Sequence, residues 1–436
     1  MARSKVMGWL LLFASVGWIA TSAYAPDSAT PRRQDLKDGR NSLLQRCRNR
    51  ILTNVQLRPI GVVGVSPVAR NATASLMGGS LYVAGNNVPS FFDAWPDFAA
   101  LTIVNAGDPE QLIIAPIGAF RFLSPRVVAL QDGTIHLLWG EYARNSETPR
   151  PTDWLSPIAD EVWTAWRSSA GLWSKPTRLF AGRTLWDKAS AGQIARYNDE
   201  FALAAPHFPQ SAGERIGLVV FEYRSYAWHV SEIATVVSPG LSATAIDQTH
   251  TVVVFVAADT ERKVRNAVFL ATKNRTQPEF ELPRPLQPAN RNPATFVATS
   301  AGGDSRFHVV WHSQKGEGGS EISHIDFSAQ NKDDVGTPHS APLRGDFQYG
   351  AAALDACGVF HVAFQNYEFG RPGGSLEYVV WNGAWQAQRS VFSDMRAMDP
   401  AFAVDSAGAV VLVVLAQPQT APPRSPYSTM LAWIKR

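Results

Sequence analysis

The sequence is poor in charged residues and in cysteine, and its one long apolar run stands at the start. Asp, Glu, Lys and Arg make up 18% of the 436 residues, while apolar residues make up 45%. This composition is typical of a globular protein and excludes a disordered one. Residues 1–50 carry a net charge of +6, so the remaining residues carry −3 of the formal total of +3. The rest of the chain therefore gives no electrostatic reason to bind nucleic acid.

Familiar catalytic and metal-binding motifs are missing as well. The chain has no HExxH, GxSxG, P-loop or CxxC pattern. The sequence thus gives no sign of the zinc, serine-nucleophile or nucleotide sites that these motifs build. We predict neither a metal ion nor a cofactor.

The N-terminal residues have the form of an export signal. Arg3 and Lys5 form a short basic start, residues 6–20 are apolar, and the small residues Ala23 and Ala25 follow. We assign residues 1–25 to a signal peptide and residues 26–50 to a basic polar leader. An uncut membrane anchor is the alternative, although an apolar run of about 15 residues is short for a span. No later segment is suited to crossing a bilayer, so we expect a secreted or periplasmic protein.

Cysteine occurs only at Cys47 and Cys357. In an oxidising compartment two cysteines are a candidate disulfide, which would tie the leader to the sixth of the repeats described next. Two unpaired thiols are the alternative.

A pair of short strands recurs along residues 51–436. Each copy has an apolar strand, a tight polar or glycine turn and a second, more apolar strand, most clearly at residues 126–139, 351–364 and 401–414. The residue three positions past each turn marks the repeat, and these markers follow at intervals of 50 to 66 residues: Tyr82, His136, Ala202, Val252, His308, His361 and Val411. A period of about 50 residues with several short strands is typical of a β-propeller.

Third and fourth strands follow the marker in most copies. They are clearest at residues 161–166 with 173–179, and at residues 376–381 with 385–391. The second of these hairpins turns at Asn382-Gly383, a strong hairpin signal. The second strand of each copy is apolar on both faces, as expected for sheets that stack on neighbours on both sides.

The two ends of the repeat region complement each other. The last repeat ends after its third strand at residues 429–433, while residues 55–63 form a strand without a partner of its own. If this N-terminal strand completes the last sheet, the ring closes without an exposed edge. We therefore predict an all-β, seven-bladed β-propeller over residues 51–436, with six- or eight-bladed rings as alternatives.

These repeats resemble the sialidase-like propellers built from bacterial neuraminidase repeats. The matching residues are Asp132-Gly133, His136, Trp139 and Gly171-Leu172-Trp173-Ser174 in one copy, and Gly358, His361, Asn382-Gly383 and Trp385 in another. The strict Asp-box, Ser-x-Asp-x-Gly-x-Thr-Trp, is absent in every copy. The resemblance implies a propeller that acts on or binds carbohydrate, and seven-bladed relatives include polysaccharide lyases.

The histidines at the marker positions are expected to be structural. His136, His308 and His361 occupy one repeated position, and such recurrence indicates a hydrogen bond within each blade rather than catalysis. Trp139 and Trp311 are expected to pack inside the sheets for the same reason.

The candidate site lies in the loops after the second strands and in the links between blades. These loops vary widely at residues 85–97, 140–160, 365–374 and 416–426, and variable loops on a rigid scaffold usually carry function. For acid–base catalysis we predict His207, His312, Tyr349 and Glu141. For substrate binding we predict Arg121, Tyr142, Trp186, Asp187, Lys188, Arg291 and Arg396, with arginines holding an acidic sugar.

Three functions remain open from the sequence. The first is a carbohydrate-active enzyme, either a glycoside hydrolase or a polysaccharide lyase, that acts on an acidic extracellular glycan. The second is a non-catalytic glycan-binding propeller, and the third is an envelope scaffold that binds a protein at the loop-rich face. The fold alone does not choose between them.

Overall fold

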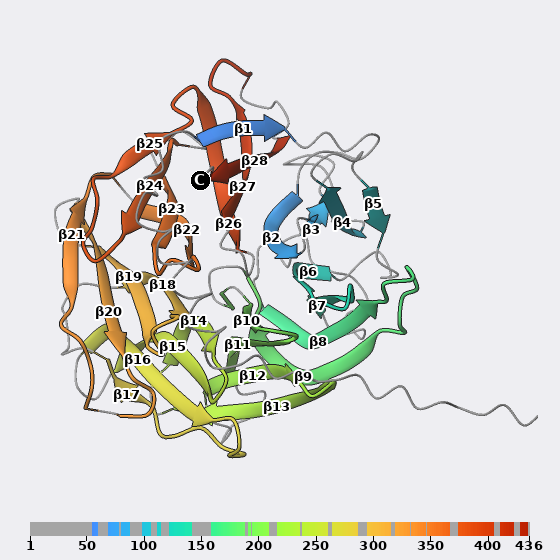
Figure 1. Ribbon diagram of the computed structural model, residues 1–436, viewed down its shortest axis with the longest axis vertical. Coiled ribbons are helices and arrows are strands. Elements are labelled where there is room, and N and C mark those ends of the chain that lie inside the picture. The colour runs from blue at the N-terminus through green and yellow to red at the C-terminus, as the bar shows by residue number, and fades with distance from the viewer. Residues whose placement is uncertain are drawn as a thin grey trace, which may run out of the picture. The chain divides into compact units, whose positions relative to one another are not determined.

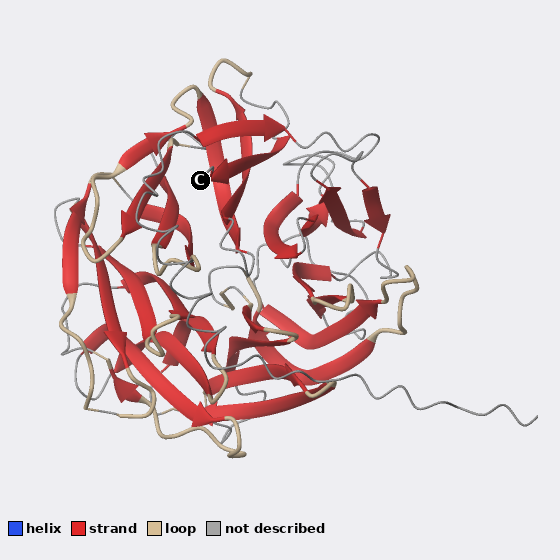
Figure 2. Ribbon diagram, in the orientation of Figure 1, coloured by secondary structure: helices blue, strands red, loops and turns tan. Residues whose placement is uncertain are grey.

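The computed structural model describes the strands and many of the turns. The described residues are 55–59, 69–77, 80–87, 98–105, 111–114, 122–141, 158–187, 191–192, 194–208, 216–235, 238–259, 264–286, 294–314, 319–331, 333–345, 347–366, 374–404, 410–422 and 428–434. All belong to the unit Arg50–Arg436, so the predicted signal peptide and leader, with Cys47, lie outside them. They contain strands and loops but no helix (Figure 2), and hence no helix that could span a membrane. The prediction of an all-β protein is confirmed.

Most of the described strands form four-stranded antiparallel sheets, labelled in Figure 1. One sheet contains β2 (Ala69–Met77), β3 (Ser80–Asn87), β4 (Phe98–Asn105) and β5 (Gln111–Ile114). The next contains β14 (Ser238–Ile246), β15 (His250–Asp259), β16 (Val264–Asn274) and β17 (Arg284–Pro285). A third contains β18 (Ala294–Ala301), β19 (Phe307–Gln314), β20 (Ser320–Phe327) and β21 (His339–Leu343). A fourth contains β22 (Phe347–Leu354), β23 (Phe360–Asn366), β24 (Leu376–Trp381) and β25 (Arg389–Val391).

A larger sheet joins two groups of strands. The first group is β6 (Phe122–Ala129), β7 (Ile135–Glu141), β8 (Ile158–Arg167) and β9 (Thr177–Leu185). The second is β10 (Ala195–Tyr197), β11 (Glu200–Phe208), β12 (Gly217–Arg224) and β13 (Ala227–Ala234). Strand pairing joins the two groups where His207 and Phe208 of β11 pair with Thr184 and Arg183 of β9.

The first and last described strands lie in one sheet. β1 (Val55–Pro59) pairs with β28 (Ser428–Ile434), with Val55 opposite Ile434 and Pro59 opposite Met430 (Figure 1). β28 in turn pairs with β27 (Val410–Pro418), and β27 with β26 (Met395–Val404). The N-terminal strand thus occupies the fourth position of the sheet whose other strands come from the C-terminal repeat, as the sequence predicts.

Neighbouring sheets contact each other through their first strands. β2 contacts both β6 and β26, β26 contacts β22, β22 contacts β18, β18 contacts β14, and β14 contacts β11. Buried apolar side chains fill the space between these sheets, and the predicted core residues Trp139 and Trp311 are 0% and 1% exposed. Their burial is confirmed.

Tight turns with an aspartate cap close many of the first hairpins. The Asp355 carboxylate accepts the backbone N–H groups of Cys357 at 2.8 Å and Val359 at 2.9 Å, and it lies 3.2 Å from Nε2 of His361. Nδ1 of His361 bonds the Tyr378 hydroxyl at 2.5 Å. His308 likewise bonds His324, with 3.1 Å between their ring nitrogens. The prediction of structural hydrogen bonds is confirmed for His308 and His361.

The same prediction is wrong for His136. Neither of its buried ring nitrogens has a hydrogen-bond partner among the described residues. Its ring instead lies among Phe201, Tyr223 and Trp228, with centroid distances of 5.2, 4.4 and 6.2 Å. The rings come from the neighbouring group of strands, and burial among them lowers the pKa of His136 to about 4.

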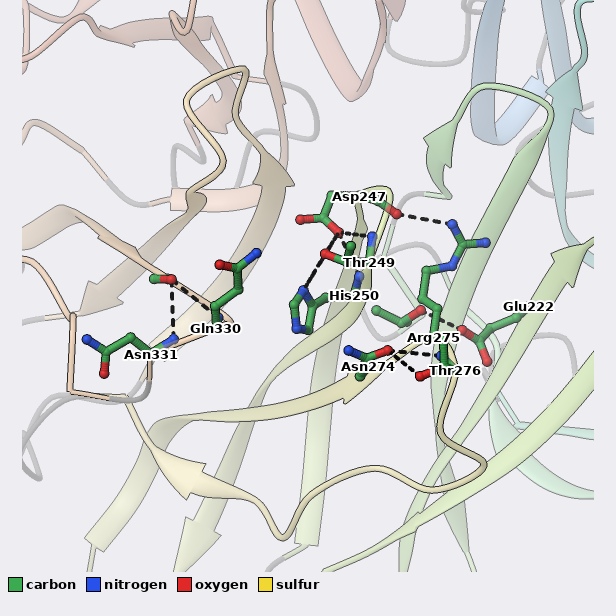
Figure 3. Close-up of polar contacts among 11 residues, drawn as sticks. Glu222, Asp247, Thr249, His250, Asn274, Arg275, Thr276, Gln330 and Asn331 are labelled. Carbon is green, nitrogen blue, oxygen red and sulfur yellow. Dashed lines mark hydrogen bonds and ion pairs between the residues drawn. The ribbon is translucent and has the colours of Figure 1, made fainter.

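Polar side chains also join β11 and β12 to the β14–β16 sheet near its turns (Figure 3). Arg275 pairs with Glu200 and donates to the Asp247 carbonyl oxygen at 3.1 Å. Lys273 and Glu222 form an ion pair in which both side chains are buried. Because this pair is sealed from solvent, it serves to hold the two sheets together rather than to meet a ligand.

Candidate functional site

The first strands share an irregularity near their N-terminal ends. In each of β2, β6, β14, β18, β22 and β26 the register shifts, at Arg70/Thr73, Leu123/Arg126, Pro239/Leu241, Ala294/Phe296, Gln348/Gly350 and Met398/Ala401 respectively. Such bulges are over-represented next to active sites, where they redirect side chains. We call this end of the sheets, defined by these shifts, the bulged end. The opposite end, at turns such as residues 130–134 and 355–358, is the turn end.

An aromatic cluster at the bulged end supports His207. The imidazole is half-buried and lies edge-on to Phe180, with 5.2 Å between ring centroids. Phe180 contacts Phe221, and Phe221 contacts Trp186, at 6.2 and 5.8 Å. His207 is therefore held by packed rings and still reaches solvent.

Trp186 is fully buried because neighbouring residues leave room for it. A Cβ atom on Gly140 would lie 2.9 Å from the Trp186 ring and 2.7 Å from Ala159 Cβ, so only glycine fits opposite the indole. The indole Nε1 donates a hydrogen bond to the Ser124 carbonyl oxygen at 3.1 Å. Trp186 thus ties the segment after β9 to the bulge of β6.

Two buried polar atoms around this cluster lack partners in the described part of the chain. They are Oγ1 of Thr184, the residue paired with His207, and Nε of Arg126. Buried polar groups normally bind protein, water or ligand. Arg126 Nη2 donates to the Asp187 carbonyl oxygen at 2.8 Å, and burial lowers the Arg126 pKa to about 10. The site therefore offers a half-exposed imidazole and the half-buried Asp187 beside buried polar groups.

His312 lies in a different and more enclosed place. Its Nδ1 bonds Oγ1 of Thr295 at 2.6 Å, and its ring stacks on Phe347 with 4.2 Å between centroids. Only 1% of the residue is exposed, and burial lowers its pKa to about 4. His312 is therefore neutral at pH 7 and does not face solvent.

The predicted site residues divide into three sets. Trp186 and His207 belong to one aromatic cluster, linked through Phe180 and Phe221, and Asp187 follows Trp186 in the chain. His312 packs on Phe347, Glu141 accepts a hydrogen bond from Trp139 Nε1 at 2.8 Å, and Arg396 lies on β26 opposite Gln417. Tyr349 is the bulged residue of β22, and its side chain is not described. Arg121, Tyr142, Lys188 and Arg291 lie outside the described residues.

Sequence reasoning missed the residues that support the site. Arg126 and Thr184 stand inside strands whose apolar pattern gives no sign of a buried polar group. The Ser124-Pro125 pair was the only available signal, because proline within a strand indicates a bulge or an edge. Among the described residues, no cluster of three or more His, Cys, Asp or Glu side chains is suited to a metal ion.

Comparisons with solved structures find proteins of similar fold. No protein-family model and no curated protein matches the chain. Among solved structures, an ulvan lyase of polysaccharide lyase family PL25 has a TM-score of 0.52 at 12% identity, with 86% of this chain and 95% of that chain covered. The polysaccharide lyase Uly1 has a TM-score of 0.50 at 12% identity, covering 86% and 91%. The Trypanosoma rangeli sialidase has a TM-score of 0.48 at 10% identity, covering 86% and 57%. At such low identity, the two lyases show likeness of fold alone.

Proposed function

We propose that this protein is a carbohydrate-active β-propeller enzyme, a polysaccharide lyase or glycoside hydrolase, that acts on an acidic extracellular glycan at the bulged end. The observation that carries the proposal is the aromatic cluster that links His207 to Trp186, next to Asp187, beside two buried polar atoms that have no partner in the described part of the chain. A fold like that of two polysaccharide lyases supports it.

The accessible histidine suits acid–base chemistry. A catalytic acid or base has to reach the proton that it transfers, and His207 is half-exposed whereas His312 is enclosed. We therefore assign proton transfer to His207, with Tyr349 as the partner acid and Asp187 as a hydrogen-bond acceptor for sugar hydroxyls. His312 supports the bulge through Thr295. In this proposal Arg396, with Arg121 and Arg291, holds the substrate carboxylate.

The architecture proposed for this site is a closed ring of seven four-stranded blades. The pairing of β1 with β28 and the chain of contacts between first strands support it. The sheet of eight strands then counts as two blades, joined by the short β9–β11 pairing. Ring closure would leave no blade with an open face.

Export and a disulfide complete the proposal. A secreted or periplasmic protein would allow Cys47 to bridge to Cys357. Cys357 packs at the edge of the core between the last two sheets. Thiol titration of the unfolded, unreduced protein should find no reactive thiol, and two thiols per chain would refute the bridge.

Polysaccharide turnover tests the function directly. The purified protein is incubated with a panel of uronate-containing and neutral polysaccharides, and new reducing ends and absorbance from unsaturated uronates are followed. A lyase gives both signals, whereas a hydrolase gives reducing ends alone. His207→Gln should lower kcat at least about 100-fold. His229→Gln on the exposed face of β13 is the matched control and should not.

The outcomes separate the alternatives. Glycan binding without turnover would leave a non-catalytic glycan-binding propeller. Neither binding nor turnover across the panel would refute both sugar functions and leave a protein-binding scaffold. Full turnover by the His207 variant would refute the assignment of His207 while leaving the enzyme class intact.

A further inference from the structure

Arg126 is a fully buried cation at the bulged end. It is 0% exposed, and burial of an unpaired charge costs several kcal/mol unless other groups compensate for it. Its described hydrogen bonds go to backbone oxygens: Ser124 at 3.2 Å, Pro125 at 3.5 Å and Asp187 at 2.8 Å. The guanidinium group thus joins the bulge of β6 to the segment that follows β9.

Other side chains hold the same bulge. Thr73 of β2 donates to the Pro125 carbonyl oxygen at 3.0 Å and accepts the Val127 N–H at 3.3 Å. Trp186 donates to the Ser124 carbonyl oxygen. Ser124 has a φ of 31°, an uncommon backbone angle for a residue that is not glycine. The neighbours therefore fix a backbone conformation that would not persist alone.

A second bulge of the same kind lies on the other side of β2. In β26 the register shifts at Asp399-Pro400, and Asp399 has a φ of 55°. Both bulges are a residue with positive φ followed by proline, and both β6 and β26 contact β2. Strained residues of this kind concentrate at functional sites. At the position that Ser124 occupies in the β6 bulge, the β26 bulge has the carboxylate of Asp399.

Asp187 and Asp399 both lie within electrostatic reach of Arg126. Both carboxylates favour the protonated form of the Arg126 guanidinium, against the opposing effect of burial. Asp399 comes from the last repeat and Asp187 from the link after β9, so Arg126 is the group that connects these segments electrostatically.

We propose that Asp399 is a further residue of the ligand site and that Arg126 is a positioning residue, which holds Asp187 and Asp399 at the bulged end by compensating their charge. Carboxylate oxygens accept hydrogen bonds, so this pair fits the hydroxyl donors of a sugar. The role in sugar binding rests on the function proposed above. The coupling of the three charges is independent of that function.

A double-mutant cycle tests the coupling without any substrate. Urea unfolding is measured for wild type, Arg126→Met, Asp399→Asn and the double variant. Asn tolerates positive φ, so Asp399→Asn removes charge and little else. In the wild-type background, Asp399→Asn should raise the unfolding equilibrium constant. In the Arg126→Met background the same substitution should raise it about 3- to 100-fold less, because the charge that Asp399 compensates is gone. Asp394→Asn in the exposed turn before β26 is the matched control and should show no coupling to Arg126.

Further measurements keep the test decisive. Should Arg126→Met fail to fold, Asp399→Asn is compared with Asp394→Asn in the wild type and in Arg126→Lys, which retains the charge. Equal costs for the two asparagine variants would overturn the proposal. The Trp186 indole N–H resonance should shift in Arg126→Met and return toward its position in Arg126→Lys, and an unmoved resonance would refute the positioning role.

Measurements of glycan turnover test the role of Asp399 separately from the proposed carbohydrate-active function. With a polysaccharide that the wild type degrades, Asp399→Asn should raise KM about tenfold or more, by loss of a charged hydrogen-bond acceptor, while Asp394→Asn leaves it unchanged. Charge coupling with no glycan turnover would refute the proposed function only. Turnover with KM unchanged in Asp399→Asn would refute the place of Asp399 in the site.

Discussion

The turn end and the bulged end of the sheets differ in how they treat polar groups. At the turn end, Asp355 caps two backbone N–H groups and bonds His361, and Asp247 accepts the N–H groups of Thr249 and His250. At the bulged end, Arg126, Thr184 and His312 each keep a buried polar atom without a partner in the described residues. The aspartate-capped turns repeat along the chain and stabilise the scaffold. Unpartnered atoms are not confined to the bulged end, because both ring nitrogens of His136 at the turn end also lack a partner in the described residues.

The largest expected effect is on the bulged end itself. Trp186→Ala removes a fully buried indole and its hydrogen bond to Ser124, and should lower the free energy of unfolding by about 3–5 kcal/mol. Urea denaturation followed by circular dichroism measures this loss. Trp166→Ala is the control, because Trp166 is 44% exposed and should cost about 1 kcal/mol or less. Similar losses would show that the bulged end is not specially packed.

Acid should lower the free energy of unfolding because one histidine at the turn end and one at the bulged end are buried in the neutral form. The pKa of His136 and that of His312 are lowered to about 4 by burial, so the unfolded chain binds protons that the folded chain does not. The stability that these two neutral imidazoles contribute is therefore full above about pH 6.5 and is lost as the pH falls from about 6.5 to 4. Each histidine should contribute about 3 kcal/mol to that loss.

The matched variants are His136→Phe at the turn end and His312→Phe at the bulged end. Each should flatten the fall in the free energy of unfolding between pH 6.5 and 4, measured by urea titration at each pH. A slope unchanged in both variants would contradict the burial of neutral imidazole.

A smaller effect is expected from the aspartate caps. Asp355→Ala leaves two backbone N–H groups and His361 without their acceptor, and should cost about 2–3 kcal/mol. Asp132 caps a single N–H, that of Thr134, so Asp132→Ala should cost about 1 kcal/mol. Thermal unfolding of the two variants gives the comparison. Equal shifts in Tm would show that bond number does not set the strength of these turns.

The smallest effect concerns one strained turn at the turn end. Ser225 and Tyr226 both have positive φ, 51° and 61°, and Tyr226 is 79% exposed. Asn-Gly suits such a hairpin turn, so the double change Ser225→Asn and Tyr226→Gly should raise the free energy of unfolding by about 1 kcal/mol. A stabilised variant with altered ligand binding would show that this turn, too, carries function.

The regular parts of the fold could be predicted because their signals are local. Gly133, Gly358 and Gly383 all have positive φ, between 73° and 83°, and each stands at a turn that the sequence marks with glycine. The alternation of short apolar strands and turns then gives four strands per repeat. The third repeat was hard to detect because its first strand, β10, has only three residues.

The site was predicted only in part because its contacts are not local. Trp186 and Asp187 were proposed from a link between repeats and His207 from the end of a strand, and the packing of Phe180 and Phe221 brings them together. Arg126 resembles any residue at a strand start until its burial is known. The prediction of a structural hydrogen bond for His136 was wrong for the same reason, since the rings around it come from a neighbouring group of strands.

The pairing of β1 with β28 has a consequence for synthesis. Val55 leaves the ribosome early, and its partner Ile434 follows only after every other described strand has been made. The sheet that holds both is therefore the last to form, and the nascent chain carries an unpaired strand until then.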